Sequence, residues 1–149
     1  MRNGMLKALL SAAAAAMLAI VPVRSVHAVA TPQSLAIELN NATDNEGGCS
    51  LTFKAVNGTG ELIGKASYEI VVFDPEDKAV QFLIMEFGRL LAGKTKVVAF
   101  DFPNRKCGEI KSILVNDAAA CEIGGEESLI CLDRLATSTR NGMTIGFGQ

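Results

Sequence analysis

The sequence predicts an all-β protein, an antiparallel two-sheet sandwich of the immunoglobulin-like or fibronectin-like type with about seven strands. Short runs of apolar, β-branched and aromatic residues recur along the chain, separated by turn-forming residues. Several runs alternate apolar with polar residues, which is the period of a half-buried strand. Nearly every connection is too short for the helix that a parallel α/β fold requires. The chain has no tryptophan, so the tryptophan marker of antibody domains is missing.

The strongest pair of runs spans residues 66–87, ASYEIVVFDPEDKAVQFLIMEF. Residues 74–77, Asp-Pro-Glu-Asp, are typical of a turn with proline at its second position. The two flanking runs therefore predict a β-hairpin in the middle of a buried sheet. The second arm, residues 79–87, is apolar on both faces, so a short buried helix is an alternative there.

The other expected strands share alternating or strongly apolar patterns. Residues 40–48, after the first expected strand, are expected to form a polar loop. Residues 57–60, Asn-Gly-Thr-Gly, follow the second expected strand and are expected to form a tight connection. Residues 126–135 predict a short helical segment of one or two turns, with Leu129, Ile130 and Leu132 facing inward. The remaining expected strands lie at residues 35–40, 49–55, 97–102, 110–115 and 143–147.

Residues 1–28 have the three parts of a cleaved secretory signal peptide. A positive start precedes an uncharged run at residues 8–21, which is shorter than the roughly 20 residues that a membrane-spanning helix needs. The small-residue ending predicts cleavage after Ala28, with Ala30 as a second site. We therefore expect a single disulfide-bonded domain, residues 29–149, that is periplasmic or secreted and is not inserted in a membrane after cleavage.

Cleavage after Ala28 would leave 11 basic and 16 acidic residues, a net charge of −5 with no basic cluster. We expect no binding to nucleic acid or anionic membranes. His27, the chain's one histidine, would also leave, so no Ser–His or Cys–His nucleophile pair and no imidazole ligand would remain. We therefore expect no enzyme, cofactor or metal; a carboxylate pair acting as a weak hydrolase is the alternative.

Cys49, Cys107, Cys121 and Cys131 all lie after the expected cleavage site. An even number of cysteines in an exported chain predicts two structural disulfides, for which three pairings exist. The sequence favours Cys49–Cys107, a link between strands, and Cys121–Cys131, a local bridge around a polar glycine-containing segment. A zinc site or a thiol–disulfide oxidoreductase would require C-x-x-C, and the chain has none.

Three further motifs have structural and functional interpretations. Residues 88–95, GRLLAGKT, match the phosphate-loop pattern, but the strand-like residues that follow favour a hairpin connection over nucleotide binding. The acidic residues at 44–48 and 74–77 could hold calcium through carboxylate oxygens, although solvated turns are the simpler interpretation. Asn41 and Asn57 begin glycosylation sequons by pattern.

Five short segments carry a resemblance over most of the mature chain: CSLTF (49–53), VFD (72–74), LAGKT (91–95), FDFP (100–103) and LVND (114–117). With these the chain resembles small, uncharacterised exported proteins of alphaproteobacteria. The resemblance implies a bacterial periplasm, where glycosylation of the sequons is not expected, and it carries no activity or functional residue.

These observations together predict an exported, non-enzymatic β-sandwich that acts as a periplasmic protein-interaction or envelope-associated module. Its expected partner is another periplasmic or envelope protein, bound by loops at one end of the sandwich or by an exposed strand edge. The alternative is a carrier of a small ligand or of calcium that uses the acidic loops.

Overall fold

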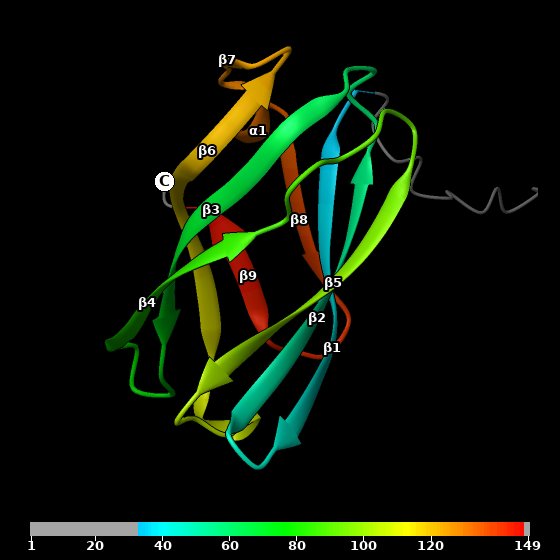
Figure 1. The fold of residues 1–149 in the computed structure, drawn as a ribbon. Coiled ribbons are helices and arrows are strands. Elements are labelled where there is room, and N and C mark those ends of the chain that lie inside the picture. Colours follow the sequence, from blue (N-terminus) through cyan, green and yellow to red (C-terminus); the bar gives the residue numbers. More distant parts are fainter. Residues whose placement is uncertain (1–32, 148–149) are drawn as a thin grey trace, which may run out of the picture.

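A computed structural model describes residues 33–147, so the expected signal peptide lies outside the described residues. This part of the chain is built mostly of strands, which confirms the all-β class (Figure 1). The strands are β1 (Leu35–Asn45), β2 (Gly48–Asn57), β3 (Ile63–Phe73), β4 (Ala79–Glu86), β5 (Thr95–Pro103), β6 (Ser112–Ile123), β7 (Glu126–Glu127), β8 (Leu135–Thr139) and β9 (Thr144–Phe147), with a 3₁₀ turn η1 (Cys107–Glu109) and a helix α1 (Ile130–Asp133).

The strands form two sheets. Sheet A has the order β5-β2-β1-β8; sheet B has the order β4-β3-β6-β7, and β9 also pairs with β6. The sheets are mixed, because β1 pairs with β8 and β6 with β9 in parallel, so the prediction of a purely antiparallel fold is wrong. After β6 the chain crosses to sheet A as β8 and returns to sheet B as β9. A hairpin connection imposes antiparallel pairing, but neither β8 with β1 nor β9 with β6 is joined by a hairpin. These two pairs can therefore be parallel.

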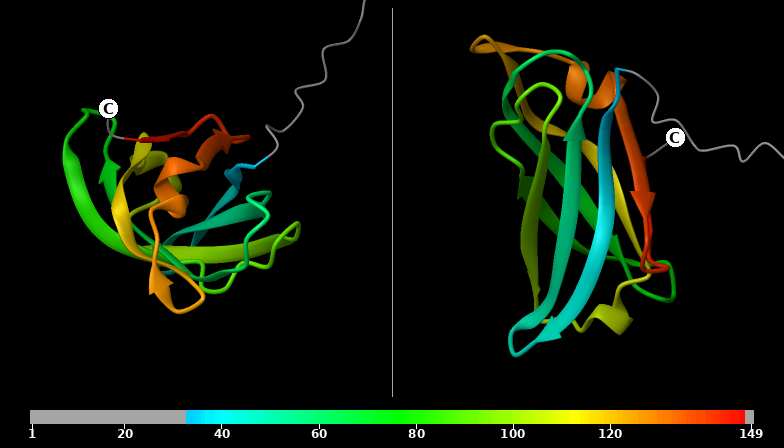
Figure 2. Two further views of the ribbon diagram at one scale, coloured as in Figure 1. Left: turned by 90° about the horizontal axis from the view of Figure 1, so that it is seen from above. Right: turned by 90° about the vertical axis from the view of Figure 1, so that its right-hand side faces the viewer.

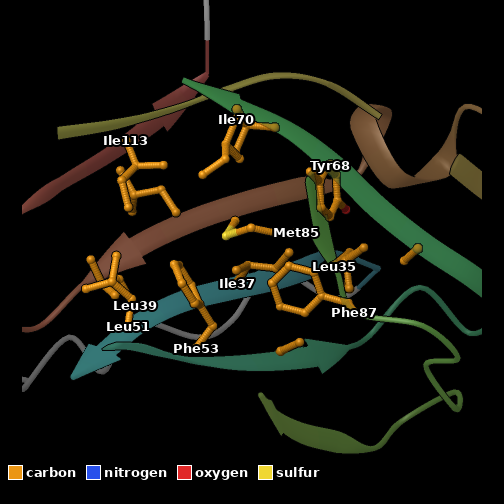
Figure 3. Close-up of a cluster of buried hydrophobic side chains, with 14 of the residues drawn as sticks. Leu35, Ile37, Leu39, Leu51, Phe53, Tyr68, Ile70, Met85, Phe87 and Ile113 are labelled. Atoms are coloured by element: carbon orange, nitrogen blue, oxygen red, sulfur yellow. The ribbon is translucent and has the colours of Figure 1, made fainter. Parts of the chain in front are cut away.

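The hydrophobic core lies between the two sheets, as the labelled side chains in Figure 3 show. Alternate residues of each strand enter it, as the period of a strand requires. Sheet A contributes Leu35, Ile37 and Leu39, and sheet B contributes Tyr68 and Ile70, each at most 2 % exposed. The two views in Figure 2 show the sheets as facing layers.

The predicted hairpin is confirmed. Asp77 donates its backbone N–H to the Asp74 carbonyl at 3.0 Å, which closes the turn. The second arm is the strand β4 rather than a helix, because it pairs with β3 from Ala79 to Glu86. Only one face of β4 is buried: Met85 is 2 % exposed, whereas Phe82 is 72 % exposed.

Two strands are longer than the sequence predicts. The expected polar loop at residues 40–48 continues as β1 to Asn45, because the residues from Asn41 to Asn45 still pair with β2 after a register shift at Asn40. Strand β6 runs through an alanine-rich segment to Ile123, held by its pairing with β3. Both segments lack the apolar pattern of a strand, and they are extended because their backbones pair with a neighbouring strand.

The expected helical segment at residues 126–135 is correct only for the short helix α1; strand β7 precedes it and β8 starts at Leu135. Leu129 is 71 % exposed, so its predicted inward position is wrong. Cys131 takes the inward position with no exposed surface. A residue two positions away along a helix points to roughly the opposite side, about 200° around the axis. Leu129 therefore faces solvent.

Candidate interaction surface

Both disulfides join the pairs that the sequence favours. Cys49 of β2 bonds Cys107 of η1, with Cα atoms 4.9 Å apart, and Cys121 of β6 bonds Cys131 of α1 at 5.9 Å. The first bridge ties sheet A to the connection between β5 and β6. The second holds α1 against sheet B, where Tyr68 donates its hydroxyl hydrogen to the Cys131 carbonyl at 3.0 Å. Two such bridges are typical of a protein from an oxidising compartment.

The first acidic segment is a turn whose polar groups bind other parts of the chain. Asn45 Oδ1 accepts the backbone N–H groups of Gly47 and Gly48 at 2.9 and 2.8 Å. Asp44 accepts the N–H of Cys107 at 2.6 Å, so its carboxylate lies beside the Cys49–Cys107 disulfide. Both sulfur atoms are bonded to each other and are not thiolates, the form in which cysteine binds metal.

The second acidic segment is likewise stabilised from within. Asp74 Oδ1 accepts the N–H groups of Glu76 at 3.0 Å and Lys78 at 2.9 Å, and Asp77 pairs with Lys111 at 2.6 Å. These are the hydrogen bonds of an Asx-type turn. Neither acidic segment shows a set of carboxylate oxygens converging on one point.

The phosphate-loop pattern at residues 88–95 connects β4 of sheet B to β5 of sheet A, so it links two sheets and is not a hairpin. It is held to the end of β2 by the hydrogen bonds Gly93 N–H to Asn57 O, 2.7 Å, and Asn57 N–H to Lys94 O, 3.1 Å. The segment runs directly into a strand. The helix N-terminus that would bind phosphate in this motif is therefore not present at this position.

The two outer faces of the sandwich differ in how their charges are paired. On sheet A, Glu38 lies between two cations, with Lys54 Nζ at 3.4 Å and Arg140 Nε at 3.0 Å. The hydrogen bond from Asn40, together with Arg140, lowers the pKa of the Glu38 carboxyl below its usual value. The central carboxylate of this face is therefore neutralised.

The outer face of sheet B carries a groove of about 420 Å³ along β3 and β4. Apolar side chains dominate its walls: Phe82 and Ile84 of β4 are 72 % and 52 % exposed. Val71, directly across from Phe82, is only 6 % exposed, although it lies outside the core between the sheets. We call this feature the β4 groove; it is lined by Glu69, Ile70, Val71, Phe82, Leu83, Ile84 and Asn116.

One carboxylate, Glu69, lines the β4 groove, and a second, Asp117, lies next to it across the sheet. Glu69 of β3 is directly across from Asp117 of β6 and from Ile84 of β4. No cation among the described residues lies within ion-pairing distance of either carboxylate. Like charges directly across a sheet repel each other. This face therefore combines exposed apolar groups with negative charge that the described chain does not neutralise.

The fold and this surface define a two-sheet β-sandwich with two disulfides and an apolar, acidic groove at a sheet edge. Comparisons with protein-family models, curated protein sequences and solved structures find no match. Within residues 33–147, no helix is long and apolar enough to cross a bilayer.

The sequence did not identify the groove, although its signal is visible. Residues 79–86 are apolar on both faces, which indicates burial on both faces of a central strand or an exposed apolar face on an edge strand. Only the strand order decides between them, and β4 is at the edge. Of the two interaction regions expected from the sequence, the strand edge carries such a surface.

Proposed function

We propose that this protein is exported to a bacterial periplasm, where it acts without catalysis by binding another protein or as part of the envelope. Residues 1–28 and the two disulfides support export. The loss of His27 on cleavage supports a non-enzymatic role. The observation that carries the interaction role is the exposure of Phe82 and Ile84 on an edge strand, since exposed apolar patches of this kind mark interaction sites.

The same proposal includes an immunoglobulin-like type for the sandwich. In that type, strands A, B and E share one sheet and C and F share the other. Strands β1, β2 and β5 correspond to A, B and E in order and pairing, and β3 and β6 to C and F. The parallel strands β8 and β9 depart from the pattern.

The export part is tested by expressing the whole chain in a bacterium, separating the periplasm and measuring the intact mass. We expect a periplasmic chain that begins at Val29 or Thr31 and has no free thiols. Recovery of the uncleaved chain in the cytoplasm with four reactive thiols would contradict export.

The interaction part is tested in intact cells of the native host with a tagged chain and a lysine-reactive cross-linker. We expect one or a few discrete adducts containing an envelope protein, and excess untagged protein should compete them away. If repeated experiments recover only uncross-linked chain, the interaction role is wrong.

A further inference from the structure

We infer that the β4 groove binds an extended segment of another polypeptide, which adds as a strand to the free edge of β4. This segment presents apolar side chains to Phe82 and Ile84 and a lysine or arginine to Glu69. The inference rests on the proposed function and gives it a site and a partner chemistry.

The first argument is the open edge. Strand β4 pairs with β3 on one side only and lies at the border of sheet B (Figure 1). Edge strands are normally protected from pairing by lysine, proline or a covering segment. Of the two edge strands of sheet A, β5 follows this rule, because it carries Lys96 and ends at Pro103, whereas the short strand β8 has neither residue type. Between Ala79 and Glu86, β4 has neither residue type.

The second argument is the apolar surface beside that edge. Side chains alternate across a strand, so Val71 lies on the outer face while Ile70 enters the core. Phe82 lies directly across from Val71, and both face away from sheet A. An added strand would place its alternate side chains next to Phe82 and Ile84 and remove their exposed surfaces from water. This is the recognition mode in which backbone pairing supplies affinity and alternate side chains supply specificity.

The third argument is charge. Glu69 and Asp117 face each other without a cation, whereas Glu38 on the opposite outer face has two. A basic side chain on the added strand would relieve this repulsion, because Glu69 lies across from Ile84 and is within reach of a long side chain laid over β4.

Charge also selects against a second copy of this chain as the occupant. In a symmetric pairing of two β4 strands, the only charge that each copy brings between Ala79 and Glu86 is Glu86 itself. Such a pairing would leave Glu69 and Asp117 without a cation. A different polypeptide with a basic residue fits the site better.

The test is a selection of random 12-residue peptides, displayed on phage, against the oxidised mature chain. We expect the enriched peptides to alternate apolar residues and to contain at least one lysine or arginine. As synthetic peptides they should bind the Phe82→Ser variant about tenfold more weakly, the effect of removing one apolar anchor at an interface.

Two further variants make the test specific. Val97 is 63 % exposed on β5, an edge strand of sheet A, so Val97→Ser is the matched control and should leave binding unchanged. Glu69→Lys should abolish binding of the basic peptides, and a peptide with glutamate in place of the lysine should restore it. Circular dichroism and melting temperature establish that each variant is folded.

The inference is overturned if no peptide is enriched, if the enriched peptides are acidic, or if Phe82→Ser binds them as tightly as the parent. A concentration-dependent dimer that Phe82→Ser abolishes would assign the groove to a second copy and also overturn it. An envelope adduct that forms equally well with Phe82→Ser would overturn the groove but leave the proposed function intact. If the selected peptides bind the groove but no envelope adduct forms in cells, the groove is supported and the proposed interaction role is wrong.

Discussion

Asn57 shows how a single buried side chain can organise a connection. It is 1 % exposed, and its amide donates to the carbonyls of Glu61 and Leu90 at 2.8 and 2.9 Å. Its Oδ1 accepts the N–H and hydroxyl of Thr59 at 3.1 and 2.7 Å. From the sequence, Asn57 is expected to lie in a turn and to be the first residue of a glycosylation sequon. In the structure, the Asn57 side chain joins three segments of the chain by hydrogen bonds, and its amide is inaccessible to modification.

We expect Asn57→Ala to lower the free energy of unfolding by about 2–3 kcal/mol, because it removes the side-chain hydrogen bonds to Glu61, Leu90 and Thr59 at a nearly buried position. The Leu90 carbonyl would keep only the N–H of Ile63. Urea unfolding measures the change. The control is Asn41→Ala, at an exposed sequon asparagine with one side-chain hydrogen bond to Thr43, which should cost less than about 0.5 kcal/mol. Equal losses for the two variants would contradict this role for Asn57.

Tyr68 is the chain's one tyrosine, so its ionisation can be followed without interference from another. Burial raises the pKa of its hydroxyl far above the usual value of about 10, because the interior disfavours the charged phenolate. In an alkaline titration of absorbance, we expect no phenolate near pH 10 in the folded protein. Ionisation should appear only at much higher pH or with unfolding, whereas the urea-unfolded chain should titrate normally.

A group with a raised folded-state pKa stabilises the fold fully below its unfolded-state pKa. Tyr68 therefore contributes stability that is lost as pH rises above about 10, the pH at which it would ionise in the unfolded chain. Phenolate absorbance near pH 10 in protein that remains folded would mean that the Tyr68 hydroxyl is hydrated. It would also contradict the hydrogen bond to Cys131.

At the scale of elements, the two disulfides join segments that hydrogen bonding alone connects weakly. The helix α1 has four residues and η1 has three, and each holds one cysteine of a bridge. Elements this short are not stable by themselves, because a helix needs several turns to offset its nucleation cost. The bridges therefore position these elements on the sheets.

We expect loss of the Cys49–Cys107 bridge to cost about 4 kcal/mol and loss of the Cys121–Cys131 bridge about 3 kcal/mol, since loop-closure entropy grows with the enclosed length. The sequence separations are 58 and 10 residues. Urea unfolding of the two double alanine variants measures both values. Variants as stable as the parent would show that the bridges have no such role.

At the scale of the whole molecule, stability should be graded from the centre of each sheet to its edges. Strands β2 and β3 have a neighbour on both sides, whereas β4 and β5 have one. Local opening has its lowest cost where backbone hydrogen bonds are exposed and apolar burial is small.

Hydrogen–deuterium exchange should therefore show slow amides along β2 and β3 and fast ones at the outward N–H groups of β4. Adding a peptide from the selection described above should slow exchange in β4 and leave β5 unchanged, which makes β5 an internal control. Protection of β4 as strong as that of β3 in the free protein would mean that its edge is already covered.

Strand content, the hairpin at residues 74–77 and the favoured disulfide pairing could all be predicted from the sequence. Each depends on local information: a two-residue period, a proline-containing turn, or the position of a cysteine beside a strand. The β4 groove could be predicted only in part. The apolar residues of β4 are visible in the sequence, but its position at an edge is set by which strands pair, and this depends on residues far apart in the chain.

The sequence by itself determined that this is a disulfide-linked all-β chain, because side-chain alternation and turn chemistry act between near neighbours. The tertiary structure alone decided that β8 and β9 pair in parallel, that Leu129 faces solvent and that Phe82 is exposed on an open edge. Those outcomes follow from how the chain crosses between two sheets, where backbone pairing and burial between distant segments outweigh local preference.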